Sequence, residues 1–228
     1  MNQIVFSTYA HSPAIDYAAT ELKKLGYSFC DINRCTHLLL PIPSTSNIPD
    51  VDGKITLIGG NLNTQFPTID LLKDAQYLAQ NAMITAHCAI KIAVNKLDSI
   101  LSDNRILIIG WGRIGKCLAQ LLRQINCPVT VAARKITDRA ILTGLGYEAI
   151  DIDEIDLTDY SIVFNTAPEL LFPDCTVDSL LIDLASKPGL TGDGVIVARG
   201  LPGKEAPASS GKLIAATIHR ILQNMEVL

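Results

Sequence analysis

The second half of the chain, from about residue 104, alternates between two patterns of apolar and polar positions. Short runs that are apolar throughout are typical of strands buried on both faces, and the amphipathic runs between them are typical of helices. The predicted strands are 105–110, 128–133, 148–150, 161–166, 180–185 and 194–198, and the predicted helices are 113–125, 137–144 and 207–223. This alternation predicts an α/β fold with a doubly wound parallel sheet of strand order 3-2-1-4-5-6.

The first half shows the same alternation on a smaller scale. The predicted strands are 3–8, 36–44 and 54–60, and the predicted helices are 12–26 and 68–80. A mostly apolar stretch follows, with small and aliphatic residues at helical spacing at Ala86, Ala89, Ile90, Ala93, Leu97 and Ile100. We therefore predict a small N-terminal α/β lobe over residues 1–82 and a linking helix over residues 83–103.

A glycine-rich turn separates the strand at 105–110 from the amphipathic helix that follows. Its glycines have the spacing G-x-G-x-x-G, which allows a tight turn, close approach of a diphosphate to the backbone, and close packing of helix on strand. The helix N-terminus adds N–H groups and positive potential. The motif predicts a Rossmann-type NAD(P)-binding domain over residues 104–228. The cofactor-binding residues predicted in this turn are Gly110, Gly112, Arg113, Ile114 and Gly115.

The end of the second strand of this domain indicates which dinucleotide is bound. NAD-binding domains commonly place a carboxylate there, whereas this chain has Ala133 followed by Arg134 and Lys135. The planar guanidinium of Arg134 suits a 2′-phosphate, Lys135 adds a positive charge, and Arg113 can reach the same side. We therefore predict NADP as the cofactor, with NAD as the alternative. Arg134 and Lys135 would otherwise be solvated residues that open the next helix.

Further candidate residues follow the later strands, because ligands of doubly wound sheets bind beyond the carboxyl ends of the strands. Asn165, Thr166 and Pro168 are predicted to contact the ribose or the nicotinamide, although a plain turn would also explain them. Ser186 and Lys187 follow the next strand. Lys187 is suited to bind a substrate carboxylate as a cation or to exchange a proton.

The segment from residue 199 to residue 212 is rich in glycine, proline and serine and lies at the start of the last predicted helix. Ser209 is expected either to cap that helix or to help bind an anion. Arg199 and Lys204 add positive charge for substrate carboxylates. His87 on the linking helix shares a face with Lys91 and is a candidate proton carrier, although a histidine on an apolar helix is more often structural.

The composition narrows the classes of partner. A net charge of −4 with scattered basic residues argues against nucleic-acid binding. The apolar runs are too short to span a membrane and the N-terminus does not resemble a signal peptide, so we expect a cytoplasmic protein. The six cysteines form no C-x-x-C pair, and Cys30, Cys35 and His37 offer too few ligands, so we predict no metal.

Five segments, in this order and spacing, resemble the A subunits of the bacterial dipicolinate synthases: GWGRIGK, VTVAARK, FNTAP, LLIDLASKPG and GLPGKEAPASSGK. The resemblance covers about residues 80–228. It implies a nicotinamide-dependent oxidoreductase of sporulating bacteria that makes dipicolinate from a dihydrodipicolinate-type cyclic dicarboxylate, together with a flavoprotein-like B subunit. With the cofactor inferred from Arg134 and Lys135, we predict an NADP-dependent enzyme of this type. It also implies that the substrate end of the site is lined by Ser186, Lys187, Pro202, Gly203 and Ser210. For this reaction we predict Lys187, His87, Ser186 and Lys204 as the catalytic residues, with Lys187 or His87 as the base.

Two other functions fit the same sequence. A D-2-hydroxyacid-dehydrogenase-like reductase would share the glycine turn and the helix that leads into it. A catalytically weak NADP-binding regulatory or scaffold subunit would fit the linking helix, where His87 and Cys88 replace the acid and the glycine usual in the family. For each function we expect a homodimer, because Rossmann-type chains of this size often pair.

Overall fold

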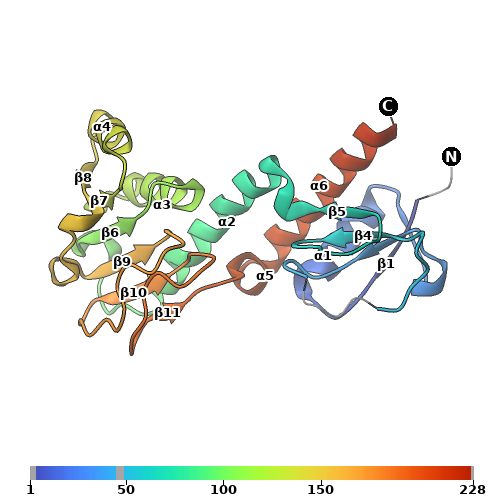
Figure 1. Cartoon of the computed structure of the whole chain (residues 1–228), viewed down its shortest axis with the longest axis horizontal. Coiled ribbons are helices and arrows are strands. Elements are labelled where there is room, and N and C mark those ends of the chain that lie inside the picture. The colour runs from blue at the N-terminus through green and yellow to red at the C-terminus, as the bar shows by residue number, and fades with distance from the viewer. Residues whose placement is uncertain (1–3, 45–48, 227–228) are drawn as a thin grey trace. The chain divides into compact units, whose positions relative to one another are not determined.

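The computed structural model describes residues 4–44 and 49–226 (Figure 1). Residue 3 of the first predicted strand lies outside the described residues. Contacts divide the chain into two compact units, one of residues 1–84 with 202–228 and the other of residues 85–201. Each unit is built on its own parallel sheet.

The second unit contains the predicted doubly wound sheet. Its strands are β6 (Ile106–Ile109), β7 (Val129–Ala132), β8 (Glu148–Ile150), β9 (Ile162–Asn165), β10 (Leu180–Asp183) and β11 (Ile196–Val197). They pair in parallel in the order β11-β10-β9-β6-β7-β8, which is the order 3-2-1-4-5-6 when β6 is counted first. The predicted fold class is therefore confirmed.

The helices of this unit pack through the faces that the sequence pattern predicts. Helix α3 (Arg113–Gln124) buries Gly115, Leu118, Ala119 and Leu122, and α4 (Ile136–Gly144) buries Leu142. All four residues of β6 are buried, as expected of a central strand covered on both faces. The glycine turn between β6 and α3 is thus held between two buried elements.

The first unit has a five-stranded parallel sheet of order β2-β1-β3-β4-β5. Its elements are β1 (Val5–Thr8), α1 (Pro13–Lys24), β2 (Ser28–Phe29), β3 (His37–Leu39), β4 (Thr56–Gly59) and β5 (Thr68–Asp70). The short helix predicted at 68–80 is wrong in its first part, because residues 68–70 pair with β4. A helix then begins at Ala75, where the Asp74 carboxylate accepts a hydrogen bond of 2.7 Å from the Tyr77 N–H.

That helix, α2 (Ala75–Val94), joins the rest of the predicted short helix to the predicted linking helix without a break. It passes from the first unit into the second between residues 84 and 85. The linking helix was predicted to extend to residue 103, but the α-helix ends at Val94 and a short 3-10 helix follows at Leu101–Asp103.

The C-terminal boundary of the nucleotide-binding unit also differs from the prediction of 104–228. Helices α5 (Leu201–Glu205) and α6 (Pro207–Glu226) follow β11, and residues 202–228 belong to the first unit. The cause is apolar packing, since Ile214, Ile218 and Leu222 of α6 share a core with Phe6 and Leu22. Figure 1 shows α6 running beside α1 within that unit. Because α6 begins at Pro207, Ser209 lies inside the helix rather than at its cap.

Gly211 permits the close contact between α6 and α1. A Cβ atom at this position would lie 2.4 Å from the Tyr17 Cβ, 2.6 Å from the Ala14 carbonyl oxygen and 2.8 Å from the Ala18 nitrogen. Two of these atoms are backbone atoms, so a small side-chain movement could not relieve the overlap. Gly211 is thus required by helix packing.

We predict that Gly211→Ala destabilises the protein by about 1–3 kcal/mol through overpacking, as measured by urea unfolding followed by circular dichroism. The matched control is Gly144→Ala in α4, where a Cβ would meet no atom of the described residues within 4 Å. The control should unfold at the wild-type urea concentration or slightly above it. Equal midpoints for Gly211→Ala and wild type would contradict the packing argument.

Candidate functional site

The loops that follow β6, β9 and β10 form a cavity at the carboxyl edge of the second unit's sheet. Parallel pairing brings the carboxyl ends of all its strands to this edge. The cavity has a volume of about 580 Å³ and is lined by Gly112, Arg113, Ile114, Lys116, Thr166, Pro168, Leu184, Ala185 and Ser186. Such a volume suits a small-molecule or cofactor site. Half of the predicted cofactor residues therefore lie together with Ser186 in the lining of this cavity.

A larger cavity, of about 760 Å³, lies at the opposite edge of the same sheet. It is lined in part by Asn104, Ser161 and Leu180, which precede or begin strands. Ligands of doubly wound sheets bind at the carboxyl ends, where the glycine turn and the N-terminus of α3 also lie. We therefore assign the candidate site to the smaller cavity.

The glycines of the turn have different roles. Gly110 has φ +101°, and a Cβ at Gly115 would lie 2.1 Å from the Gly110 carbonyl oxygen, so these two glycines allow the turn and the packing of α3 on β6. At Gly112, by contrast, a Cβ would meet no described atom within 4 Å. The backbone is open at the N-terminus of α3, beside Arg113. This open, positively charged helix start fits a diphosphate group.

Thr166 ties the loop after β9 to the glycine turn. Its hydroxyl donates a hydrogen bond of 2.9 Å to the Ile109 carbonyl oxygen, and a Cβ at Gly110 would lie 2.7 Å from the Thr166 Oγ1. Thr166 thus lines the cavity and also sets the spacing of two of its walls.

Asp183, at the end of β10, is the centre of a buried polar network. Its side chain is 0% exposed, and Oδ1 accepts a hydrogen bond of 2.7 Å from the Asn165 Nδ2. Oδ2 accepts one of 3.1 Å from the Gly189 N–H and contacts the Arg199 Nη2 at 3.3 Å, while the Ala185 N–H lies 3.3 Å from Oδ1. A buried carboxylate is stabilised by such donors. The network joins the ends of β9, β10 and β11.

The network assigns structural roles to two predicted ligand residues. Asn165 was predicted to contact the cofactor, but its side chain is fully buried, and its amide also bonds the backbone of Ala167. Arg199 was predicted to hold a substrate carboxylate, but its guanidinium binds Asp183 and the Ala185 carbonyl oxygen. Both residues therefore position loops of the site.

The same network fixes the loop that carries Lys187. Ala185 and Gly189, on either side of the exposed residues Ser186 and Lys187, both donate backbone hydrogen bonds to Asp183. A Cβ at Gly189 would lie 2.0 Å from the Asn165 Nδ2, so glycine is needed there. Ser186 lines the cavity, and Lys187 follows it at the same edge.

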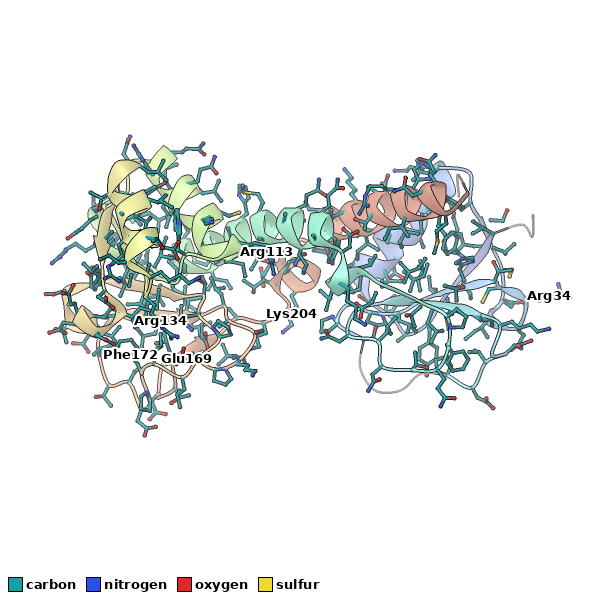
Figure 2. All side chains as sticks on the ribbon, turned by 45° about the horizontal axis from the view of Figure 1, so that its top comes forward. Arg34, Arg113, Arg134, Glu169, Phe172 and Lys204 are labelled. Carbon is teal, nitrogen blue, oxygen red and sulfur yellow. The ribbon has the colours of Figure 1, made fainter. Side chains whose placement is uncertain are left out.

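Arg134 and Lys135, after β7, are exposed, and Arg134 is paired with a carboxylate. Its Nη2 contacts the Glu169 carboxylate from the loop after β9 (Figure 2). In the sequence alone, the absence of a carboxylate at the end of β7 favours binding of a 2′-phosphate there. The fold, however, brings the Glu169 carboxylate from another loop to Arg134. The backbone of Arg134 is held by Arg139, whose Nη1 donates to the carbonyl oxygens of Ala133 and Arg134, each at 2.8 Å.

The remaining predicted catalytic residues lie in different parts of the chain. His87 is exposed on α2 in the second unit. Lys204 is exposed on α5 in the first unit (Figure 2). Ser210, which the resemblance places at the substrate end of the site, is buried in α6 of the same unit. The first-unit placement follows from the apolar face of α6 and from the close approach of α6 to α1 at Gly211.

Sequence reasoning missed Asp183, Glu169 and Arg139. Asp183 had a detectable signal, since a carboxylate ends an otherwise apolar strand just before a glycine-containing loop. Glu169 directly follows the predicted residue Pro168, but its contact with Arg134 joins loops 35 residues apart. Arg139 bonds carbonyl oxygens of the loop just before its own helix, a local contact that no recognised sequence motif indicates.

Two further observations on the described residues concern other kinds of site. Within residues 4–44 and 49–226, His, Cys, Asp and Glu side chains do not gather in threes as they would around a metal ion. In the same part of the chain, none of the helices is both long enough and apolar enough to cross a membrane.

Comparison with known proteins supports the resemblance predicted from the motifs. No protein-family model matches the chain. The A subunit of dipicolinate synthase from Bacillus subtilis (strain 168) is 27% identical over 161 residues, which are 64% of this chain and 54% of that protein. The match thus spans about half the length of this curated relative.

Solved structures extend the likeness to the whole fold. The dipicolinate synthase A chain from Bacillus subtilis has a TM-score of 0.81 at 19% identity, and the alignment covers 100% of this chain and 98% of that one. For the corresponding protein from Bacillus halodurans the TM-score is 0.77 at 21% identity, with 96% of each chain covered. Sequence and fold together confirm the predicted resemblance to the A subunits of dipicolinate synthases.

We predict that Asp183→Asn destabilises the protein by about 3 kcal/mol, because Arg199 and the surrounding N–H donors lose the buried negative charge. Urea unfolding monitored by circular dichroism measures the effect. Asp178→Asn is the matched control, because it removes an exposed carboxylate at the opposite edge of the same sheet and should change stability by less than about 0.5 kcal/mol. Equal effects of the two substitutions would show that the network does not hold the site.

Proposed function

We propose that this chain, which resembles the A subunits of dipicolinate synthases in sequence and in fold, is an NADP-dependent oxidoreductase acting on a dihydrodipicolinate-type cyclic dicarboxylate. The observation that carries the proposal is the cavity at the glycine turn. There, Gly112 directly precedes α3 and its backbone is open, and the loops after three strands line the cavity. The relative from Bacillus subtilis is named as a dipicolinate synthase subunit, which supports the choice of substrate class.

The residues of the cavity fit a nicotinamide dinucleotide. A bound nicotinamide supplies hydride-transfer chemistry, while the protein supplies binding, orientation and electrostatics. The Gly112 backbone and Arg113 would hold the diphosphate at the helix N-terminus. Arg134 and Lys135, after β7, would bind near the adenosine ribose, where a second phosphate distinguishes NADP from NAD.

The substrate would be held at the loop after β10. Oxidation of a dihydropyridine-type ring removes a hydride and a proton, so the site needs a cation for the carboxylates and a base for the proton. Lys187 follows Ser186 on a loop fixed at both ends by Asp183, so its position is defined by buried contacts. We assign Lys187 to one of these roles, either as the protonated amine that binds a carboxylate or as the neutral amine that accepts the ring proton, with His87 as the second candidate for the base.

We predict that Gly112→Ala weakens binding of NADPH and NADH at least about tenfold, because a methyl group enters the space where a diphosphate must approach the backbone. Fluorescence titration with each reduced nucleotide measures the dissociation constants. The melting temperature should stay at the wild-type value, since the new methyl group meets no described atom within 4 Å. Gly144→Ala serves as the matched control, and unchanged binding by Gly112→Ala would exclude this cavity as the dinucleotide site.

We predict that Lys187→Ala lowers turnover of dihydrodipicolinate at least about tenfold while NADPH still binds. Lys187→Arg distinguishes the two roles, because it keeps the positive charge but cannot act as a base. Lys54→Ala, an exposed lysine of the first unit, is the control. Wild-type turnover by Lys187→Ala would remove this residue from the mechanism. Nucleotide binding without turnover by the wild type, even in the presence of a flavoprotein-like B subunit, would favour a regulatory role.

A further inference from the structure

The ion pair between Arg134 and Glu169 spans the glycine turn. Arg134 follows β7 and Glu169 follows β9, and in the sheet these two strands lie on either side of β6. Glu169 is also the immediate neighbour of Pro168, which lines the cavity. The pair therefore connects the loops that flank the proposed diphosphate site (Figure 2).

We propose that Glu169 is a specificity-determining residue that competes with the 2′-phosphate of NADP for Arg134. The inference rests on the proposed binding of a nicotinamide dinucleotide. Where NAD-binding domains commonly have a carboxylate at the end of the second strand, this chain has Ala133. Glu169, from the loop after β9, instead brings a carboxylate to the guanidinium of Arg134, the group that a phosphate would need.

The pair is built so that a phosphate can displace the carboxylate. Both side chains are largely exposed, 63% for Arg134 and 56% for Glu169, and exposed ion pairs are weak. A phosphate monoester carries more charge and more acceptor oxygens than a carboxylate, and it matches the guanidinium fork equally well. Arg134 can thus exchange one anion for the other.

Arg139 holds the backbone after β7, so that an exchange of anions involves only the side chain of Arg134. Its Nη1 donates to the carbonyl oxygens of Ala133 and Arg134 and lies 2.7 Å from the Asp151 Oδ2. The Arg139 side chain is only 22% exposed, so these contacts fix the backbone after β7. The Arg134 guanidinium can therefore turn from Glu169 to a ligand without movement of the loop.

The two nucleotides respond differently to this arrangement. With NADP bound, Glu169 loses its partner and lies close to a negative phosphate, which weakens binding. With NAD bound, the pair can stay intact, and the carboxylate can accept a hydrogen bond from the ribose hydroxyl. Glu169 thus shifts the preference toward NAD, against the effect of Arg134 and Lys135.

Dissociation constants of NADPH and NADH, measured by fluorescence titration at one low ionic strength, test the proposal. The variants are Glu169→Gln, Arg134→Ala and the double variant. We expect Glu169→Gln to tighten NADPH binding at least about threefold and to leave NADH binding within about twofold. The gain should vanish in the Arg134→Ala background, because the competition acts through Arg134.

Asp178→Asn is the matched control, since it removes the same charge at the opposite edge of the sheet and should leave the ratio of the two dissociation constants unchanged. The proposal is overturned if Glu169→Gln changes this ratio less than about twofold, or if the change persists without Arg134. In both cases the nucleotides still bind, so the proposed function stands. A wild-type protein that binds neither nucleotide overturns the proposed function and this inference together.

Discussion

The candidate site depends on one buried carboxylate. Asp183 carries a negative charge at the end of β10, in a place with 0% exposure, and such a charge is tolerated only where donors surround it. Its donors come from the last residue of β9 and from the loops after β10 and β11, so satisfying this charge requires these three segments to take one arrangement. Because the buried charge of Asp183 must be hydrogen-bonded, these bonds fix the positions of the segments at the carboxyl edge of the sheet.

The glycine turn contributes the opposite property, an open backbone beside fixed walls. Gly110 and Gly115 are in close contact with neighbouring atoms, whereas Gly112 faces free space within the described residues. The helix N-terminus and Arg113 make this space favourable for an anion. The cavity thus has a rigid polar network behind the loops after β9 and β10 and an open, positively charged helix N-terminus at the glycine turn.

The loop after β7 differs from the other loops, because its outer contact is between exposed charges. Arg134 and Glu169 neutralise each other at the surface, whereas Arg139 fixes the backbone beneath them through less exposed contacts. The less exposed contacts hold the backbone of the loop, whereas the ion pair above them is exposed and therefore weak. The end of β7 alone does not describe the charges of this surface, because Glu169 comes from the loop after β9.

Local sequence patterns determined the doubly wound sheet, its strand order and the glycine turn, because apolar period and glycine spacing are properties of neighbouring residues. They also located Arg113, Thr166 and Ser186 at one edge, since parallel strands bring their carboxyl ends together. Only the tertiary structure decided that α6 packs with the first unit, that Asn165 and Arg199 serve Asp183, and that Glu169 meets Arg134. Each of these depends on residues distant in the chain, where side-chain burial and charge pairing are settled by packing and leave no local pattern.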